Sequence, residues 1–377
     1  MPPYGLLLVG GSHTHQENYA RSFAADPRCR LIGLTDESDV CAERRALNKR
    51  LAGELSIPYL DDLDDALARE DVQLVSVCVE PERRGRVAVR CARAGKHLYL
   101  DKPLAASIDD ARKIVAAVKE QRVLSQMFSL VRSPAAARAR DDWISGRLGQ
   151  PIGLHCELMF AKGVSGTADL SQPRHETALP KQFTWIDSKR ELFCVGLYPL
   201  VLFQWLAGKK VKTVHAVTAN YFFEEHQRND AEDFACVLLG YEGGVEATIT
   251  VGRTGWSSHP REGIHQIRLV GSERSMMIDV WRPRLEVYSD NPSWRPPAQP
   301  HPDDPMGFWS STAREIGIEP KSAWQPIGPI AKSDGSYFLD CLEQQRESDV
   351  SAAVGAHAVE VIMAAYRSAA SGQTVSL

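Results

Sequence analysis

The stretch LLLVGGSHTHQENYA, residues 6–20, joins a short apolar run to a segment with a helical pattern. A dinucleotide-binding β-α-β unit carries its glycine fingerprint, G-x-G-x-x-G, directly after its first strand. Gly10 occupies the first glycine position, whereas Ser12 and His15 stand where the second and third glycines belong. The stretch therefore predicts a Rossmann-type unit whose phosphate-binding turn is altered.

The first 127 residues continue this alternation of strands and helices. Short apolar runs at 30–36, 74–79 and 97–100 are typical of strands, and helical patterns separate them. The run at 74–79, LVSVCV, is apolar throughout, as expected of a central parallel strand buried on both faces. The pattern predicts a doubly wound parallel sheet with right-handed crossovers over residues 1–127.

From residue 128 onward, the pattern changes to consecutive strands separated by turn signals, such as EGG at 242–244. Helical patterns interrupt and end this region, at 191–208, 335–346 and 351–370. A proline-rich segment at 291–305 predicts a long surface loop. Residues 128–377 therefore predict an α+β domain with a large open, mostly antiparallel sheet.

The composition excludes several classes of function. The net charge is −4, so there is no positive excess to bind a nucleic-acid backbone. The longest apolar runs are far shorter than a membrane span, and MPPYGLLLVGG is typical of a first strand rather than a signal peptide. Eight scattered cysteines without a C-x-x-C pair indicate reduced thiols in a cytoplasmic protein.

Six further segments follow one another along the chain: ARAGKHLYLDKPLAASIDDARKIV, SGRLGQPIGL, ELFCVGLYPLVLFQWLAG, EDFACVLLGYEGGVEATIT, IRLVGSERSMMID and AAYRSAASGQTVSL. In these segments the chain resembles the Gfo/Idh/MocA family, which is named for glucose–fructose oxidoreductase, inositol dehydrogenase and a rhizopine-catabolism protein. The resemblance implies a Rossmann domain followed by an α+β domain. The family's open sheet commonly forms the oligomer interface, so we expect a homodimer or homotetramer.

The resemblance also implies catalytic residues. Lys102 lies in a D-K-P version of the family's E-K-P motif, whose lysine lies between nicotinamide and substrate. Its charge can stabilise a developing alkoxide in the ligand crevice. Tyr198 takes the place of the family's catalytic histidine, and we expect Lys102 to lower the pKa of Tyr198 so that it acts as a general acid/base. A solvated lysine and a tyrosine that only packs are the alternatives.

Substrate contacts are expected from the second domain. Cys194 lies four residues before Tyr198, where most family members carry an aspartate, and a buried inert thiol is the favoured interpretation. The family draws polar contacts from the segment before this helix, which holds His175 and Trp185 here. Trp185 can stack on a sugar face, although a core tryptophan beside a mobile loop is an equal alternative.

The cofactor is expected at the first two strand ends. Gly10 permits the tight turn, the Ser12 hydroxyl can bond a phosphate oxygen, and His13 follows in the same turn. Asp36 ends the second strand, 21 residues beyond His15, where an acidic side chain bonds a ribose hydroxyl and favours NAD over NADP.

The third and fourth strand ends complete the predicted cofactor site with Asp101 and with a variant of the family's T-P-x-x-x-H. Glu80 replaces its threonine, Pro81 remains, and Gly85 replaces its histidine. Glu80 is either a general base near the cofactor or the N-cap of the next helix. The pair His13 and His15 lacks a third ligand at a defensible spacing, so no metal site is predicted.

The leading hypothesis is an NAD-dependent oxidoreductase that transfers a hydride between nicotinamide and a carbinol carbon of a sugar, cyclitol or related polyol. Two alternatives stay open: a relative that uses bound NAD transiently for glycoside cleavage or elimination, and a non-catalytic ligand sensor. The altered fingerprint and Cys194 favour the alternatives. The retained Lys102 and Tyr198 favour catalysis on a small carbohydrate-like substrate, and Asp36 favours NAD.

Overall fold

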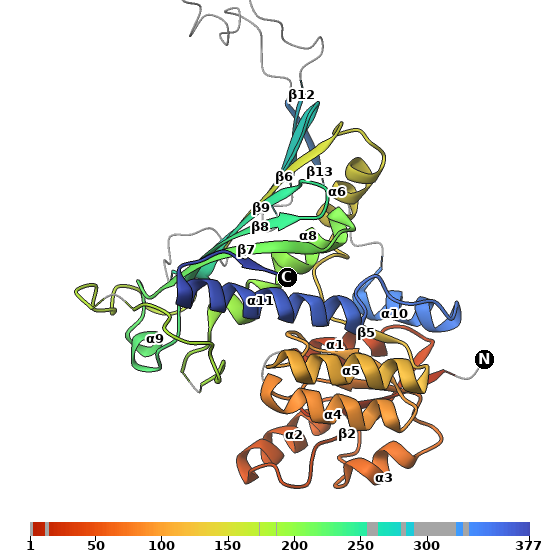
Figure 1. Cartoon of the computed structure of the whole chain (residues 1–377). Helices are drawn as coiled ribbons and strands as arrows, with labels where there is room; N and C mark the ends of the chain where they lie inside the picture. Colours follow the sequence, from red (N-terminus) through yellow and green to blue (C-terminus); the bar gives the residue numbers. More distant parts are fainter. Residues whose placement is uncertain are drawn as a thin grey trace, which may run out of the picture.

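The computed structural model describes residues 3–11, 15–172, 174–185, 187–254, 263–279, 284–289, 322–326 and 332–377. Within these residues the chain forms two sheets, with helix α11 beside both (Figure 1). Ser12, His13 and the segment 291–305 lie outside the described residues. No helix of the described part is both long and apolar enough to pass through a bilayer.

In the described residues the N-terminal domain contains a five-stranded sheet with the order β2-β1-β3-β4-β5. The strands are β1 (Tyr4–Val9), β2 (Cys29–Thr35), β3 (Leu74–Val77), β4 (His97–Leu100) and β5 (Ser125–Met127). The helices are α1 (Gln16–Ala24), α2 (Ala42–Glu54), α3 (Leu63–Ala68), α4 (Pro81–Arg93) and α5 (Ile108–Gln121). All pairings are parallel, which confirms the predicted doubly wound sheet.

The strand order of this sheet reverses between β1 and β3. Leu7 pairs with Gly33 of β2 on one side and with Val75 of β3 on the other. The chain therefore leaves the carboxyl ends of β1 and β3 in opposite directions, and a crevice for ligands opens there. This switch point decides where the site lies.

The C-terminal domain contains a sheet whose described strands have the order β13-β12-β11-β10-β6-β9-β8-β7-β14. They are β6 (Pro151–Phe160), β7 (Val211–Ala219), β8 (Phe234–Tyr241), β9 (Glu246–Arg253), β10 (Gly263–Gly271), β11 (Arg274–Asp279), β12 (Arg284–Ser289), β13 (Ser322–Pro326) and β14 (Val375–Ser376). The β6–β9 pair is parallel and the other pairs are antiparallel, as the prediction of a mostly antiparallel sheet requires.

The helices of the second region pack on one face of this sheet and against the first domain. They are α6 (Pro134–Ile144), α7 (Glu191–Cys194), α8 (Leu197–Ala207), α9 (Glu224–Arg228), α10 (Asp334–Glu343) and α11 (Ala352–Ser371). α11 touches both α5 and β7, and α10 adds Tyr337 and Phe338 to the aromatic cluster around Tyr19 and Tyr99 of the first domain. The C-terminal helices therefore join the two sheets.

The single helix predicted over 191–208 is wrong, because the chain forms the two helices α7 and α8. Gly196 lies at the break, and a Cβ there would come within 2.5 Å of the Leu192 carbonyl oxygen. Ending α7 at Cys194 leaves the last carbonyls of that helix without intrahelical donors. The break therefore leaves a backbone carbonyl oxygen beside the crevice available to accept a hydrogen bond from another part of the chain.

Candidate functional site

A cavity of about 620 Å³ lies at the switch point between the two domains. The ends of β1, β3 and β4 line its first wall, with Gly11, Glu80 and Lys102 among the contributors. Its second wall comes from the C-terminal domain and includes Trp185, which precedes α7, and Arg253 at the end of β9. Residues 83 (Lys102 and Trp185) to 242 (Gly11 and Arg253) positions apart therefore meet at one site.

The turn after β1 requires two glycines. Gly10 has φ +66° and Gly11 has φ +98°, a region in which side chains are strained. A Cβ on Gly10 would lie 2.5 Å from Val79 Cγ1, and one on Gly11 would lie 2.7 Å from the Cys78 carbonyl oxygen. Gly11 lines the cavity and was missed in the sequence, although the Gly-Gly doublet was a signal for it.

His15, which replaces the third fingerprint glycine, contacts Asp101. Its Nδ1 lies 2.8 Å from Asp101 Oδ1, which also accepts a hydrogen bond of 2.7 Å from the Tyr19 hydroxyl. Arg84 donates to the other oxygen at 3.1 Å. Burial alone would raise the pKa of Asp101, but Arg84 and His15 outweigh it and hold that pKa well below its usual range. Asp101 is therefore an ionised anchor for His15 and Arg84.

Arg84 lies behind the first wall and holds its backbone in place, and no sequence motif pointed to this residue. Its side chain is 2% exposed and donates to the carbonyl oxygens of Val79, at 2.6 Å, and Pro103. Together with the bond to Asp101, these contacts tie the end of β3 to the end of β4. Gly85, at the position of the family's histidine, instead allows α4 to approach α5, because a Cβ there would lie 2.5 Å from Asp110 Cβ.

Asp36 lies beside the glycine turn, but its carboxylate is already engaged. It accepts hydrogen bonds of 2.8 Å from the Glu37 backbone and from the Asn48 side chain, and it pairs with Arg83 at 3.0 Å. The residue is fully buried. A ribose hydroxyl would have to share or displace one of these donors, so contact with the cofactor stays a prediction.

Glu80 is the residue before α4, as the capping alternative predicted, but its side chain makes no capping hydrogen bond. It pairs instead with Arg44 and with Arg83, the latter at 2.8 Å. Burial would raise the pKa of Glu80, but Arg83 and Arg44 reverse the effect and lower it. An ionised carboxylate can act as a base, but pairing with two arginines makes Glu80 a weak one. Pro81 takes the first helical position, where proline is preorganised.

Lys102 joins the two walls. Its ammonium donates a hydrogen bond of 2.7 Å to the carbonyl oxygen of Cys194, the acceptor freed by the break after α7. It also lies 4.4 Å from the centroid of the Tyr198 ring. Burial lowers the pKa of Lys102. The predicted position of this lysine in the crevice agrees with the structure.

The prediction that Lys102 lowers the pKa of Tyr198 is wrong. Burial raises the pKa of Tyr198, and the nearby charge of Asp101 raises it further. The ammonium of Lys102 faces the aromatic ring, and the ring also packs edge-on against Phe128 at 6.3 Å. Tyr198 is therefore a protonated phenol, and it is not among the residues that line the cavity.

The three predicted substrate contacts lie in different environments. Trp185 and Cys194 line the cavity, whereas His175 is exposed and lies apart from it. Burial raises the pKa of the Cys194 thiol, which fits the inert role expected for it. Among the described residues, no group of three His, Cys, Asp or Glu side chains is placed to hold a metal ion.

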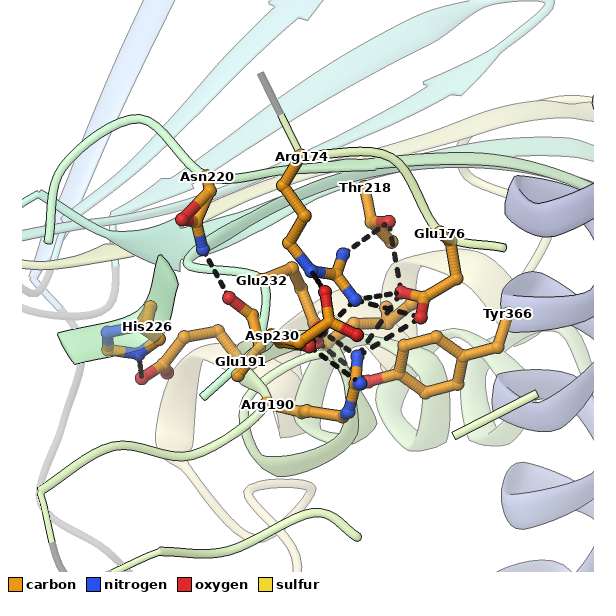
Figure 2. Close-up of polar contacts among 12 residues, drawn as sticks. Arg174, Glu176, Arg190, Glu191, Thr218, Asn220, His226, Asp230, Glu232 and Tyr366 are labelled. Atoms are coloured by element: carbon orange, nitrogen blue, oxygen red, sulfur yellow. Dashed lines mark hydrogen bonds and ion pairs between the residues drawn. The ribbon is translucent and has the colours of Figure 1, made fainter. Parts of the chain in front are cut away.

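A buried cluster of charges supports the second wall (Figure 2). Arg190 pairs with Glu232 at 2.9 Å and with Glu176 at 3.2 Å, and Arg174 pairs with Glu176 at 2.8 Å. The Tyr366 hydroxyl of α11 donates to Glu232 at 2.6 Å. These charged side chains are at most 6% exposed. The cluster fixes the segment from which α7 and the cavity wall begin.

A Rossmann-type domain, an open-sheet domain and a lysine that joins them across a cavity define a class of two-domain dinucleotide-binding proteins. Two family models match the chain. The oxidoreductase family with an NAD-binding Rossmann fold matches residues 5–129, and the GFO/IDH/MocA C-terminal domain matches residues 137–277. The chain belongs to the Gfo/Idh/MocA family of oxidoreductases.

Individual relatives are distant. The chain is 26% identical to glucose-fructose oxidoreductase domain-containing protein 1 of Mus musculus, with 59% of this chain and 55% of that protein covered. It is 23% identical to scyllo-inositol 2-dehydrogenase (NAD(+)) of Bacillus subtilis, with 74% and 73% covered. The aldose-aldose oxidoreductase of Caulobacter crescentus shares the fold, with a TM-score of 0.73, 21% identity and both chains fully covered. The chain thus spans little more than half the length of the mouse relative.

Proposed function

We propose that this chain is an NAD(P)-dependent oxidoreductase that acts on a carbinol carbon of a sugar, cyclitol or related polyol. The observation that carries the proposal is the buried ammonium of Lys102, held between the glycine turn and the second wall. A cation fixed there stabilises the oxyanion that develops as a hydroxyl-bearing carbon loses or gains a hydride. The substrates in the names of the Bacillus and Caulobacter proteins support the substrate class.

The turn after β1 fits the pyrophosphate of a dinucleotide. The absence of Cβ atoms at Gly10 and Gly11 allows a ligand to approach the backbone, and the N-terminus of α1 favours a negative group. When bound, the dinucleotide supplies or accepts the hydride. Ser12 and His13 follow Gly11 in the sequence and stay in the proposal as phosphate contacts.

Selection between NAD and NADP depends on Asp36 and Arg83. We propose that the cofactor is NAD, because Asp36 follows β2 where a carboxylate can bond the ribose. NADP is less favoured but has a possible partner, since Arg83 pairs with Asp36 and an arginine there can receive a 2′-phosphate. Glu80 and Pro81 lie beside this pair at the start of α4. Asp101 is proposed to act indirectly on the cofactor, by holding His15 in position.

Lys102 is proposed to exchange the proton of the reacting hydroxyl. A lysine whose pKa is lowered by burial can lose its proton nearer to neutral pH and then act as a base. Tyr198 is proposed as a positioning residue, because its ring holds the ammonium while its own phenol keeps its proton. The elimination alternative gains no support from Glu80, because its pairs with Arg44 and Arg83 lower its pKa and weaken it as a base.

The domain division, the oligomeric state and the compartment of the protein are also proposals. The division into residues 1–127 and 128–377 is proposed with α10 crossing back to the first domain. Two exposed side chains, Val217 and Leu238, lie on neighbouring strands of the open sheet and support a homodimer or homotetramer through that face. All eight cysteines are free, which supports a reducing, cytoplasmic compartment.

The first test is calorimetric titration of charcoal-stripped protein with NAD, NADH, NADP and NADPH, followed by a polyol screen. We expect NAD or NADH to bind more tightly than the phosphorylated forms, and hydride transfer to at least one polyol or its ketone. Preference for NADP would show that Arg83 rather than Asp36 faces the ribose. Absence of binding by any dinucleotide would exclude the oxidoreductase and favour a ligand sensor.

A further inference from the structure

Resting on the proposed function, a second inference concerns the substrate. We propose that the substrate is an anionic polyol, carrying a carboxylate or phosphate group, and that Lys189 and Arg253 bind this group. Both residues line the second wall of the cavity that holds Lys102. Neither belongs to the dinucleotide turn, which lies on the first wall.

Apart from Lys102, the ionic groups that line the first wall are paired within the protein. Glu80 pairs with Arg44, and Asp101 pairs with Arg84. A negatively charged ligand group therefore gains little from this wall beyond Lys102 and the backbone turn at Gly11. The other wall carries two cations, Lys189 and Arg253, and Lys189 has no ion-pair partner among the described residues.

Lys189 supplies one positive charge. Its ammonium has no hydrogen-bond or ion-pair partner among the side chains and carbonyls that the structure describes, although the side chain is half-buried. Its backbone is held, because residue 189 bridges to Thr184 and the next residue, Arg190, is anchored in the buried cluster. A fixed cation without a partner in a cavity is suited to an anionic ligand.

Arg253 supplies a second charge. Its Nε donates at 2.9 Å to Glu191, which is fully buried, and this bond fixes the guanidinium at the end of β9. Within the described part of the chain, its two terminal amino groups have no hydrogen-bond partner, and the side chain is 23% exposed. A guanidinium presents such groups to the two oxygens of a carboxylate or phosphate.

Glu191 pairs with Arg253 at 2.9 Å, but it is fully buried and does not line the cavity, so the charge of Lys189 remains. Asp187, which does line the cavity, is paired with Arg228 at 2.6 Å and with Asn229 at 2.8 Å. Position 194, where most family members carry aspartate, is a cysteine. Burial raises the pKa of its thiol, so the thiol stays protonated. The second wall therefore carries a net positive charge, and an uncharged polyol would leave the Lys189 ammonium without an ion-pair partner among the described residues.

The inference is tested with matched pairs of charged and uncharged polyols. Binding of D-gluconate, D-glucuronate and D-glucose 6-phosphate is compared with that of D-glucitol and D-glucose, on the protein loaded with NADH. Quenching of tryptophan fluorescence, to which Trp185 in the cavity contributes, gives a measure of binding that is independent of turnover. Lys189→Gln is the main variant because it breaks no internal contact, and Arg253→Lys is the second. Lys181→Gln, an exposed lysine outside the cavity, is the control.

We expect at least one acid to bind about tenfold or more tightly than its uncharged partner, and Lys189→Gln to lose about 10- to 100-fold of that affinity. The control should match the wild type, and the preferred acid distinguishes a carboxylate from a phosphate. Equal binding of acids and neutral polyols, no binding of any acid, or an equal effect of Lys189→Gln on both overturns the inference. If Lys189→Gln weakens NADH instead, the charge serves the cofactor and the inference also fails. Failure of the wild type to bind NADH rejects the proposed function separately.

Discussion

The two walls of the cavity are held in place by different means. The first wall depends on backbone geometry, with a positive-φ turn at Gly10 and Gly11 and with carbonyls braced by Arg84. The second wall depends on side-chain charges buried away from water, above all Arg190 and Glu232. Lys102 connects the walls through one hydrogen bond. The difference predicts that substitutions in the buried charge cluster behind the second wall affect stability, whereas those in the glycine turn of the first wall affect dinucleotide binding.

The largest effect on stability is expected from Arg190→Met, which breaks the second wall. It leaves Glu176 and Glu232 buried without their shared cation, and removal of one partner from a buried pair costs about 3–5 kcal/mol. Urea denaturation measures the loss. Arg112→Met is the matched control, because its pair with Glu360 lies at the surface and should contribute less than about 1 kcal/mol. Equal losses from both would contradict the stabilising role of the buried cluster.

The connection itself is broken by Lys102→Met. We expect kcat to fall about 10²- to 10³-fold, because the cation near the developing oxyanion is lost, while the affinity for dinucleotide changes little. Burial lowers the pKa of Lys102, so the wild-type oxidation rate should rise with pH through a value below the ordinary lysine pKa of about 10.4. In Lys102→Met this rise should vanish. Unchanged kcat, with Lys119→Met as the exposed control, would exclude the role.

The first wall is tested by Gly11→Ala. The added methyl group would lie 2.7 Å from the Cys78 carbonyl oxygen at φ +98°, a strain of about 1–3 kcal/mol. We expect dinucleotide affinity to fall at least about tenfold in calorimetry. Gly53→Ala in α2 meets no atom within 4 Å and should leave binding intact while adding about 0.5–1 kcal/mol of stability. Normal cofactor binding by the Gly11 variant would show that the turn is not the phosphate site.

The smallest effect is expected from Tyr198→Phe, which tests whether the ring or the hydroxyl of Tyr198 acts on Lys102. The variant keeps the ring under Lys102 and removes the hydroxyl, so kcat should change by less than about tenfold. Tyr198→Leu removes the ring as well and should shift the pH limb assigned to Lys102. A loss of about 10²-fold or more in Tyr198→Phe alone would restore the phenol as the acid/base.

The architecture was predictable because each strand and turn has a local signal. Apolar runs marked the parallel strands, Glu80 was a candidate N-cap, and family segments marked both domains. The break in the predicted helix 191–208 was not predicted, because its apolar residues suit a continuous helix and only Gly196 interrupts them. Without that break, the contact between Lys102 and the Cys194 carbonyl was not visible.

The electrostatics of the site were less predictable than its position. Asp36 and Lys102 were placed correctly at strand ends, but their partners come from distant parts of the chain, 47 residues away for Arg83 and 92 for Cys194. The expected effect of Lys102 on the pKa of Tyr198 also failed, because burial depends on packing that no local pattern encodes. Pairing of charges across the fold is therefore where the sequence alone is weakest.

One feature of the fold bears on the order in which the protein is made. Tyr337 and Phe338 of α10 complete the aromatic cluster around Tyr99 of β4, and the Tyr99 hydroxyl donates at 2.8 Å to Asp334. These groups leave the ribosome more than 230 residues after Tyr99. During translation, the part of this aromatic cluster that α10 covers is therefore exposed until the last helices emerge. The nascent chain carries an apolar surface for most of its synthesis, and such a surface is a target for chaperones.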